Sequence, residues 1–283
     1  MFHPDISAGL LANLTLFSEY AAASTCAANF NSHTLSKVVC DPGVCPTLEQ
    51  TDTNVMVGFM GIHHPGNVTG FVAIDNTNQL IVLSFRGSRT LGNYITDSKY
   101  QQVPAICPGC QVHKGYYWAW GNFSAFIMQP INQLAAIYPS YQIVFTGHSF
   151  GGALATLGAA LEGGNPSRPI DLIQYTFGCP QLGNHDFAEF VTAVTAGSGY
   201  RVTHSDDPVP RVFSTQPWIN KTWQYSTTSP EFWITTGNGV PVTASDIQVI
   251  EGIDNKSGNL GTTGSDTSAH IWYIGNMSGC STN

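Results

Sequence analysis

The chain has 283 residues, of which 42% are hydrophobic and only 10% are charged, so a large core can form and an intrinsically disordered chain is disfavoured. The net charge is −8 and the lysines and arginines form no cluster, which argues against a nucleic-acid partner. No apolar run reaches the ~20 residues that a membrane-spanning helix needs.

The predicted elements alternate between helices and strands, which is the pattern of an α/β domain with a mostly parallel central sheet and helices on both faces. Apolar residues at helical spacing, such as Leu10, Leu14 and Phe17, predict the first helix. In chain order we expect a helix over 6–28, strands over 70–74 and 79–85, a helix over 116–138 with a kink or break at Pro130, a strand over 142–146, a helix over 151–161, a strand over 171–177, a helix over 185–195, and strands over 200–203, 222–225 and 232–235. We find no repeat or linker in the sequence, so we expect a single domain over residues 1–283.

Cysteines and glycosylation sequons favour a secreted, extracellular glycoprotein. There are seven cysteines, and an odd number leaves at least one without a partner in the chain. The six Asn-x-Ser/Thr sequons begin at Asn13, Asn67, Asn122, Asn220, Asn255 and Asn276. The residues after Met1 lack the basic start and apolar run of a signal peptide, so we interpret the chain as a mature form.

A G-x-S-x-G motif at residues 147–151 predicts Ser149 as a nucleophile. This motif needs a strand before it and a helix after it, and the predicted elements on either side supply both. The flanking Gly147 and Gly151 let strand and helix pass close to each other around a strained serine. The start of the helix favours developing negative charge, so the backbone N–H of Phe150 is the expected first oxyanion donor. An incidental serine in a glycine-rich turn is disfavoured by both flanks.

A catalytic serine needs a general base and a carboxylate, which follow it in α/β hydrolases in the order acid, then base. Asp206 and Asp207 lie in a loop just after a predicted strand, where the active-site residues of open α/β sheets gather. His270 precedes an apolar run near the end of the chain, whereas His204 precedes both aspartates and fits the order poorly. The residues alone leave the choice between Asp206 and Asp207 open.

Four blocks of the sequence resemble the class 3 lipases of filamentous fungi, of the Thermomyces lipase type, and are also similar to fungal feruloyl esterases. They are VTGFVAIDNTNQLIVLSFRGSR at 68–89, TGHSFGGALA at 146–155, VTHSDDPVPR at 202–211 and AHIWY at 269–273. The resemblance implies an α/β-hydrolase fold and a secreted serine carboxylic-ester hydrolase that acts through an acyl-enzyme. The roles that it implies are Ser149 as nucleophile, Asp207 as acid, His270 as base, and Ser88 with Phe150 as the oxyanion hole.

The resemblance also implies three disulfides and a lid. The implied pairs are Cys26–Cys280, Cys40–Cys45 and Cys107–Cys110, which leaves Cys179 as a small buried thiol. The implied lid is a short amphipathic helix with Leu91, Tyr94 and Ile95 on one face. In the lipases such a lid opens at an oil surface, so the expected substrate is a triacylglycerol or partial glyceride at the lipid–water interface.

Other functions remain open from the sequence. Tyr94 stands where the Thermomyces-type lipase has Trp, and Gly92 weakens the lid helix, so a feruloyl or carboxylesterase on the same fold is the first alternative. A catalytically inactive secreted binding protein is disfavoured because all the site residues are present. The C-x-x-C of Cys107 and Cys110 also suits a thiol oxidoreductase or half a zinc site, but no second ligand pair accompanies it. The esterase mechanism needs no metal or cofactor, and we expect a monomer.

Overall fold

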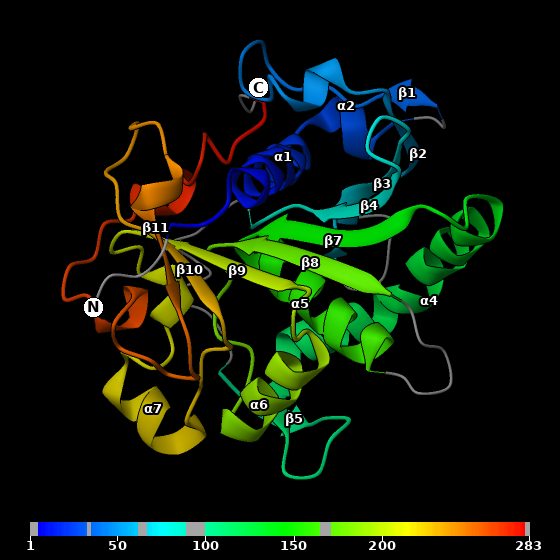
Figure 1. Cartoon of the computed structure of the whole chain (residues 1–283). Helices are drawn as coiled ribbons and strands as arrows, with labels where there is room; N and C mark the ends of the chain where they lie inside the picture. Colours follow the sequence, from blue (N-terminus) through cyan, green and yellow to red (C-terminus); the bar gives the residue numbers. More distant parts are fainter. Residues whose placement is uncertain (1–4, 33–34, 62–66, 89–99, 165–170, 281–283) are drawn as a thin grey trace.

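The computed structural model describes residues 5–32, 35–61, 67–88, 100–164 and 171–280. Within these ranges, nine strands form one mixed sheet in the order β1-β2-β3-β4-β7-β8-β9-β10-β11 (Figure 1). The strands are β1 (Ser36–Lys37), β2 (Thr53–Phe59), β3 (Gly70–Asp75), β4 (Leu80–Phe85), β7 (Gln142–His148), β8 (Leu172–Phe177), β9 (Gly199–His204), β10 (Glu231–Ile234) and β11 (Ile247–Ile250). Strands β4, β7, β8, β9 and β10 run parallel, and the strands beyond them on either side pair antiparallel. The predicted mostly parallel sheet is therefore confirmed.

Helices cover both faces of the sheet (Figure 1). They are α1 (Ala8–Ala23), α2 (Ala27–Phe30), α4 (Lys114–Ile137), α5 (Phe150–Gly163), α6 (His185–Val194) and α7 (Pro217–Trp223). Five short 3₁₀ segments accompany them: η1 (Leu48–Gln50), η4 (Val209–Arg211), η5 (Ala244–Asp246), η6 (Asn259–Gly261) and η7 (Ala269–Ile271). A separate hairpin of β5 (Gln102–Pro104) and β6 (Gln111–His113) precedes α4. No helix in the described ranges has the length and apolar character needed to cross a bilayer.

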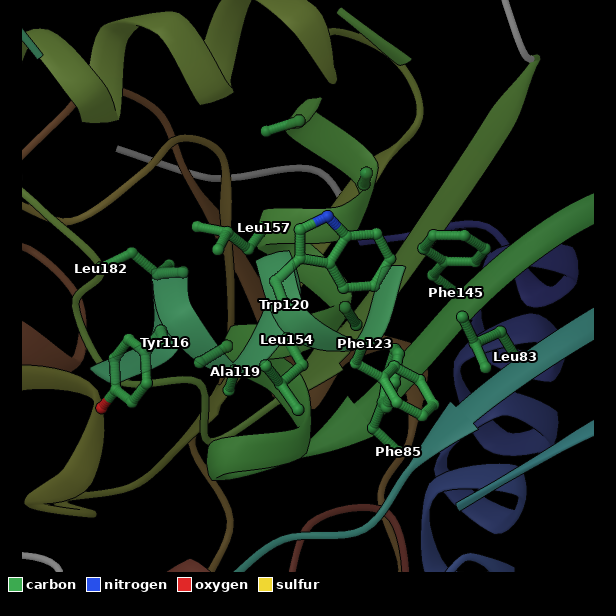
Figure 2. Close-up of a cluster of buried hydrophobic side chains, with 14 of the residues drawn as sticks. Leu83, Phe85, Tyr116, Ala119, Trp120, Phe123, Phe145, Leu154, Leu157 and Leu182 are labelled. Carbon is green, nitrogen blue, oxygen red and sulfur yellow. The ribbon is translucent and has the colours of Figure 1, made fainter. Parts of the chain in front are cut away.

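Two hydrophobic clusters hold these layers together, one on each face of the sheet. On one face α1 packs its aromatic side chains against the sheet, and the rings of Phe17 and Tyr175 stack with centroids 4.1 Å apart. On the other face α4 and α5 pack against β4 and β7, where Trp120 lies beside Phe145 (Figure 2). Every residue of β4 is buried, as its apolar run predicts for a strand covered on both faces.

Helix α5 lies unusually close to the sheet and to α4 because its residues are small. A Cβ added to Gly158 would come within 2.6 Å of the Trp120 ring. The same helix contributes a run of fully buried residues from Gly151 to Ala160. Because real Cβ contacts are essentially never that short, substitution of Gly158 requires the Trp120 ring or the helix to move.

Some sequence expectations differ from the structure. Helix α4 continues through Pro130 without a break, because its buried residues on both sides of the proline pack against the sheet and hold the helix. The predicted strand over 222–225 is wrong, since Thr222 and Trp223 end helix α7 and the next two residues belong to no strand. Helix α7 begins at Pro217, and proline is common in the first turn of a helix. The first predicted helix is divided at Ser24 into α1 and α2.

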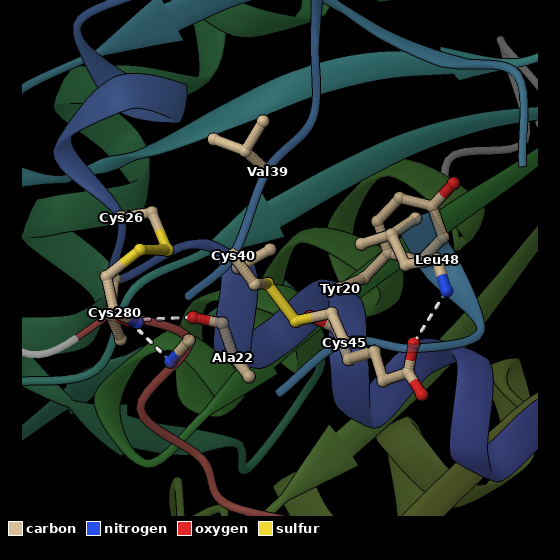
Figure 3. The surroundings of a disulfide bond; sticks show 12 residues. Tyr20, Ala22, Cys26, Val39, Cys40, Cys45, Leu48 and Cys280 are labelled. Carbon is tan, nitrogen blue, oxygen red and sulfur yellow. Dashed lines mark hydrogen bonds between the residues drawn. A yellow bond between two sulfur atoms is a disulfide. The ribbon is translucent and has the colours of Figure 1, made fainter. Parts of the chain in front are cut away.

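Three disulfides join segments that include both ends of the described chain. The structure pairs Cys26 with Cys280, Cys40 with Cys45, and Cys107 with Cys110, which are the pairs that the resemblance implies. Figure 3 shows the first two bonds beside α1, where the Gly279 N–H donates to the carbonyl of Ala22 at 3.0 Å. Cys179 is a free, buried thiol.

Candidate active site

Ser149 lies at a sharp bend between β7 and α5, with the unusual backbone angles φ 56° and ψ −124°. A positive φ costs energy for a residue with a Cβ, so the surrounding structure must impose it. A Cβ added to Gly147 would collide with the backbone of Gly151, and one added to Gly151 would collide with the carbonyl of Phe85. The Ser149 N–H donates to the carbonyl of Phe177 on the neighbouring strand at 2.9 Å. The strand, turn and helix predicted around the motif are therefore present.

His270 and Asp207 form a buried pair, although they lie far apart in the sequence. His270 Nδ1 is 2.8 Å from Asp207 Oδ2, and the side chains are 2% and 0% exposed. His270 belongs to η7, and Asp207 lies just after β9. The neighbouring Asp206 instead lies beside Gly264, and its Oδ1 accepts a hydrogen bond from the Ser205 hydroxyl. Of the two aspartates that the sequence leaves open, Asp207 is the one whose carboxylate contacts the His270 ring.

The Asp207 carboxylate accepts two further hydrogen bonds. The hydroxyl of Tyr273 donates to Oδ2 at 2.5 Å, and the Val209 N–H donates to Oδ1 at 2.9 Å. Burial and the Asp207 charge raise the pKa of Tyr273 well above its ordinary value, so its hydroxyl stays a donor. Asn259 supports the same loop, since its amide nitrogen donates to the Asp207 carbonyl at 2.9 Å. These contacts fix the carboxylate with respect to the imidazole.

Ser149 Oγ and His270 Nε2 are both buried, and neither has a hydrogen-bond partner in the part of the chain that the structure describes. They are therefore not hydrogen-bonded to each other here. The two residues are neighbours of His148, which directly precedes Ser149 and whose ring centroid lies 4.4 Å from that of His270. A serine hydroxyl and an imidazole nitrogen that both lack partners at one site are the two groups that nucleophilic catalysis would join.

The two predicted oxyanion residues flank the bend. Phe150 is the first residue of α5, so its backbone N–H belongs to the positive end of that helix. Ser88 is half-buried and follows Gly87, where an added Cβ would lie 3.3 Å from the Ser149 Cβ. The segment that contains Ser88 therefore runs directly beside Ser149. The predicted lid residues Leu91, Tyr94 and Ile95 lie outside the described residues.

Sequence reasoning missed the residues that support this site. The motif treats His148 as a variable position, and the chain order disfavours His204 as the base. In the structure His148 contacts the carbonyl of His270, whereas His204 contacts the carbonyls of Ala269 and Thr236. Burial, with a smaller contribution from His270, keeps the pKa of His148 well below its ordinary value. These roles become visible only in the structure, where all three histidines lie at the same edge of the sheet.

The described residues contain no group of three His, Cys, Asp or Glu side chains arranged to hold a metal ion. The C-x-x-C cysteines are joined to each other by a disulfide.

A mixed, largely parallel sheet flanked by helices, with a strand–serine–helix bend after a central strand, defines an α/β hydrolase. The sequence profile described as Lipase (class 3) matches residues 82–216. The chain is 35% identical over 276 residues to secreted mono- and diacylglycerol lipase A of Penicillium cyclopium, covering 95% of this chain and 86% of that relative. It is 39% identical over 275 residues to secreted mono- and diacylglycerol lipase 1 of Fusarium solani, covering 95% and 78%.

Solved structures agree with the sequence relatives. The crystal structure of mono- and diacylglycerol lipase from Aspergillus oryzae superposes with a TM-score of 0.84 at 34% identity, covering 95% of this chain and 97% of that one. The chain belongs to the class 3 lipase family, and it is a secreted lipase, a carboxylic ester hydrolase.

Proposed function

We propose that this lipase hydrolyses mono- and diacylglycerols at the lipid–water interface, with Ser149, His270 and Asp207 as its catalytic triad. The observation that carries the proposal is the buried His270–Asp207 pair beside the strained Ser149 bend. The substrate class is supported by the relatives, which are named mono- and diacylglycerol lipases. Mono- and diacylglycerols differ from triacylglycerols in carrying at least one free glycerol hydroxyl.

The tautomer of His270 follows from its partner. Since a carboxylate only accepts hydrogen bonds, Nδ1 must carry the hydrogen that bonds Asp207, and Nε2 is left with its lone pair. A lone pair at Nε2 is what a general base needs to take the proton of the Ser149 hydroxyl. The buried Nε2 has no other partner in the described chain, so it is available for this step.

The reaction runs in two halves. Ser149 Oγ attacks the ester carbonyl while His270 Nε2 takes its proton, and Asp207 stabilises the resulting imidazolium. The N–H groups of Ser88 and Phe150 bind the oxyanion, and loss of one such donor costs on the order of 10²–10³ in kcat. His270 then protonates the departing glycerol oxygen, which leaves an acyl-enzyme on Ser149. Water attacks the acyl group, gives its proton to His270, and releases the fatty acid as the proton returns to Ser149.

The nucleophile is tested with Ser149→Ala and with Ser198→Ala as a matched serine control outside the site. A fluorophosphonate should label the parent enzyme and the control, but not Ser149→Ala, whose kcat should fall by a factor on the order of 10⁶. Labelling is read by mass spectrometry of the modified peptide. Retention of most esterase activity by Ser149→Ala would disprove the assignment.

The substrate class is tested separately on the parent enzyme with emulsified mono-, di- and triacylglycerols of one acyl chain and with methyl ferulate. We expect kcat/KM for the mono- and diacylglycerols to exceed that for the triacylglycerol and for the ferulate ester. A preference for methyl ferulate would instead favour the feruloyl esterase alternative, and a preference for triacylglycerol would overturn the partial-glyceride assignment.

A further inference from the structure

Two histidine rings contact the backbone carbonyls of two consecutive residues at the proposed base. His204 Nδ1 lies 3.1 Å from the carbonyl oxygen of Ala269, and His148 Nε2 lies 2.6 Å from the carbonyl oxygen of His270. His204 is completely buried, and His148 is half-buried. The proposed mechanism uses neither ring to transfer a proton.

These carbonyls need donors because they lie at the end of a short helical turn. Within η7 the N–H groups of residues 269–271 donate backwards to residues 266–268, and the carbonyl of Ile271 accepts from Met277. The last carbonyls of a helical turn have no partner within it. Buried carbonyls without donors are costly, and a ring nitrogen of His204 or His148 lies within hydrogen-bonding distance of each of these two.

Each ring is itself held by the edge of the sheet. His148 ends β7, and its Nδ1 would be 3.4 Å from a Cβ placed on Gly87, next to the predicted oxyanion residue Ser88. His204 ends β9, and its Nε2 lies 2.8 Å from the carbonyl oxygen of Thr236, just beyond β10. As a neutral ring His204 donates to one of its two carbonyls, and as an imidazolium it donates to both. The turn that carries His270 is thus connected to three strand ends.

We propose that His148 and His204 are positioning residues that fix the place of the His270 ring by holding the carbonyls of residues 269 and 270. This inference rests on the proposed role of His270 as the base. Rotation of either peptide would swing the imidazole away from Ser149 and Asp207. Misplacement of a reacting group by about 1 Å can cost on the order of 10² in rate.

His148 gives the sharper test, because glutamine can replace its donor. The amide nitrogen of His148→Gln can occupy the place of Nε2 and donate, whereas His148→Phe keeps a ring but removes the donor. We expect His148→Phe to lower kcat roughly 10- to 100-fold on a short-chain ester below its solubility limit, with KM changed less than about twofold. His148→Gln should recover most of the lost kcat. For His204, the matched pair is His204→Leu and His204→Asn, whose amide nitrogen replaces Nδ1.

Rescue of kcat by the amide variants separates positioning from simple loss of stability, because melting temperatures report stability independently of kcat. The exposed-residue variant His185→Asn controls for removal of a histidine and should match the parent enzyme. Unchanged kcat in His148→Phe and His204→Leu, even with lower melting temperatures, would overturn the inference.

Two further comparisons keep the result decisive. If His148→Phe does not fold, His148→Gln is compared with His148→Asn, whose amide nitrogen is one carbon short of the carbonyl, and equal kcat values would overturn the inference. Fluorophosphonate labelling of the parent enzyme distinguishes this failure from failure of the proposed function. Absence of label on Ser149 refutes the triad, whereas labelled parent enzyme with fully active histidine variants refutes only the positioning role.

Discussion

Tyr273 and His270 share one oxygen atom of Asp207. The Tyr273 hydroxyl lies 2.5 Å from Oδ2, and the His270 imidazole approaches the same atom at 2.8 Å. Since the pKa of Tyr273 is raised well above its ordinary value, chiefly by burial, the hydroxyl keeps its hydrogen through neutral and mildly alkaline pH. The Tyr273 hydroxyl and the His270 imidazole therefore both stabilise the negative charge of the same buried carboxylate.

Removal of that hydroxyl in Tyr273→Phe should lower both stability and activity. A hydrogen bond to a charged group contributes about 1.5–3 kcal/mol, so the free energy of unfolding in urea should fall by that amount. The kcat should fall several-fold, because Asp207 then holds His270 less firmly. Tyr225→Phe is the matched control, since its hydroxyl donates to the neutral carbonyl of Tyr100 and should cost about 1 kcal/mol. Equal losses in the two variants would contradict the special role of the carboxylate.

His113 makes stability depend on pH. It is buried, its Nδ1 accepts the N–H groups of Gly115 and Tyr116 at the start of α4, and burial lowers its pKa from 6.5 to about 4. The unfolded chain therefore binds more protons than the folded chain between these pH values, and stability falls as the pH drops through that window. The expected loss from this residue is about 3 kcal/mol.

His113→Asn removes the titrating ring and keeps a side chain that can cap α4. Urea unfolding from pH 7 to pH 4 should show a smaller loss of stability in this variant than in the parent enzyme. Above pH 6.5, where the ring is neutral in both states, stability should change with pH equally in the two proteins. Parallel curves for the two proteins would show that another group causes any acid sensitivity.

The long-range disulfide should stabilise the fold more than either short-range one. Cys26 and Cys280 are 254 residues apart, whereas Cys107 and Cys110 are three apart. In the chain-entropy model, loss of the first bond costs about 5 kcal/mol and loss of the second about 2 kcal/mol. Melting temperatures of Cys26→Ser/Cys280→Ser and Cys107→Ser/Cys110→Ser check the order. A greater loss from the short-range pair would show that native contacts, rather than chain entropy, dominate.

Cys179 should be inert in the folded enzyme. Burial raises its pKa to about 12, and it packs beneath α5, where its Cβ would be 3.2 Å from one added to Gly152. Because the thiolate is the reactive form, iodoacetamide at pH 8 should leave the native protein unmodified. The same reagent should modify Cys179 once urea unfolds the chain, as mass spectrometry would detect. Rapid alkylation of the native protein would show that the thiol is accessible.

The local features of the fold were predictable because they are encoded in neighbouring residues. The apolar run of β4 and the glycines around Ser149 indicate a buried strand and a tight bend without knowledge of the rest of the chain. The sequence does not predict helix α7, because its aromatic and β-branched residues also suit a strand. The burial of Ile219 in the folded chain favours the helix over the strand. The course of α4 through Pro130 likewise depends on packing that lies outside the local sequence.

The candidate site divides in the same way. The motif predicts Ser149 as the nucleophile, and the resemblance implies Asp207 and His270, which contact each other in the structure. The roles of Tyr273 and His148 depend on contacts between segments that are distant in the sequence. Neither hydrophobic periodicity nor motif spacing predicts such contacts. Side chains that serve a carboxylate or a carbonyl rather than the substrate leave no motif of their own.

The close approach of α5 to the sheet limits how this enzyme can diverge. Beneath Ser149, a side chain at Gly151 would collide with the backbone of Phe85. Farther along the helix, a side chain at Gly158 would collide with the Trp120 ring. Directed evolution for new acyl or alcohol preferences should therefore accumulate changes in the surrounding loops, while libraries that randomise this helix should yield mostly unfolded protein.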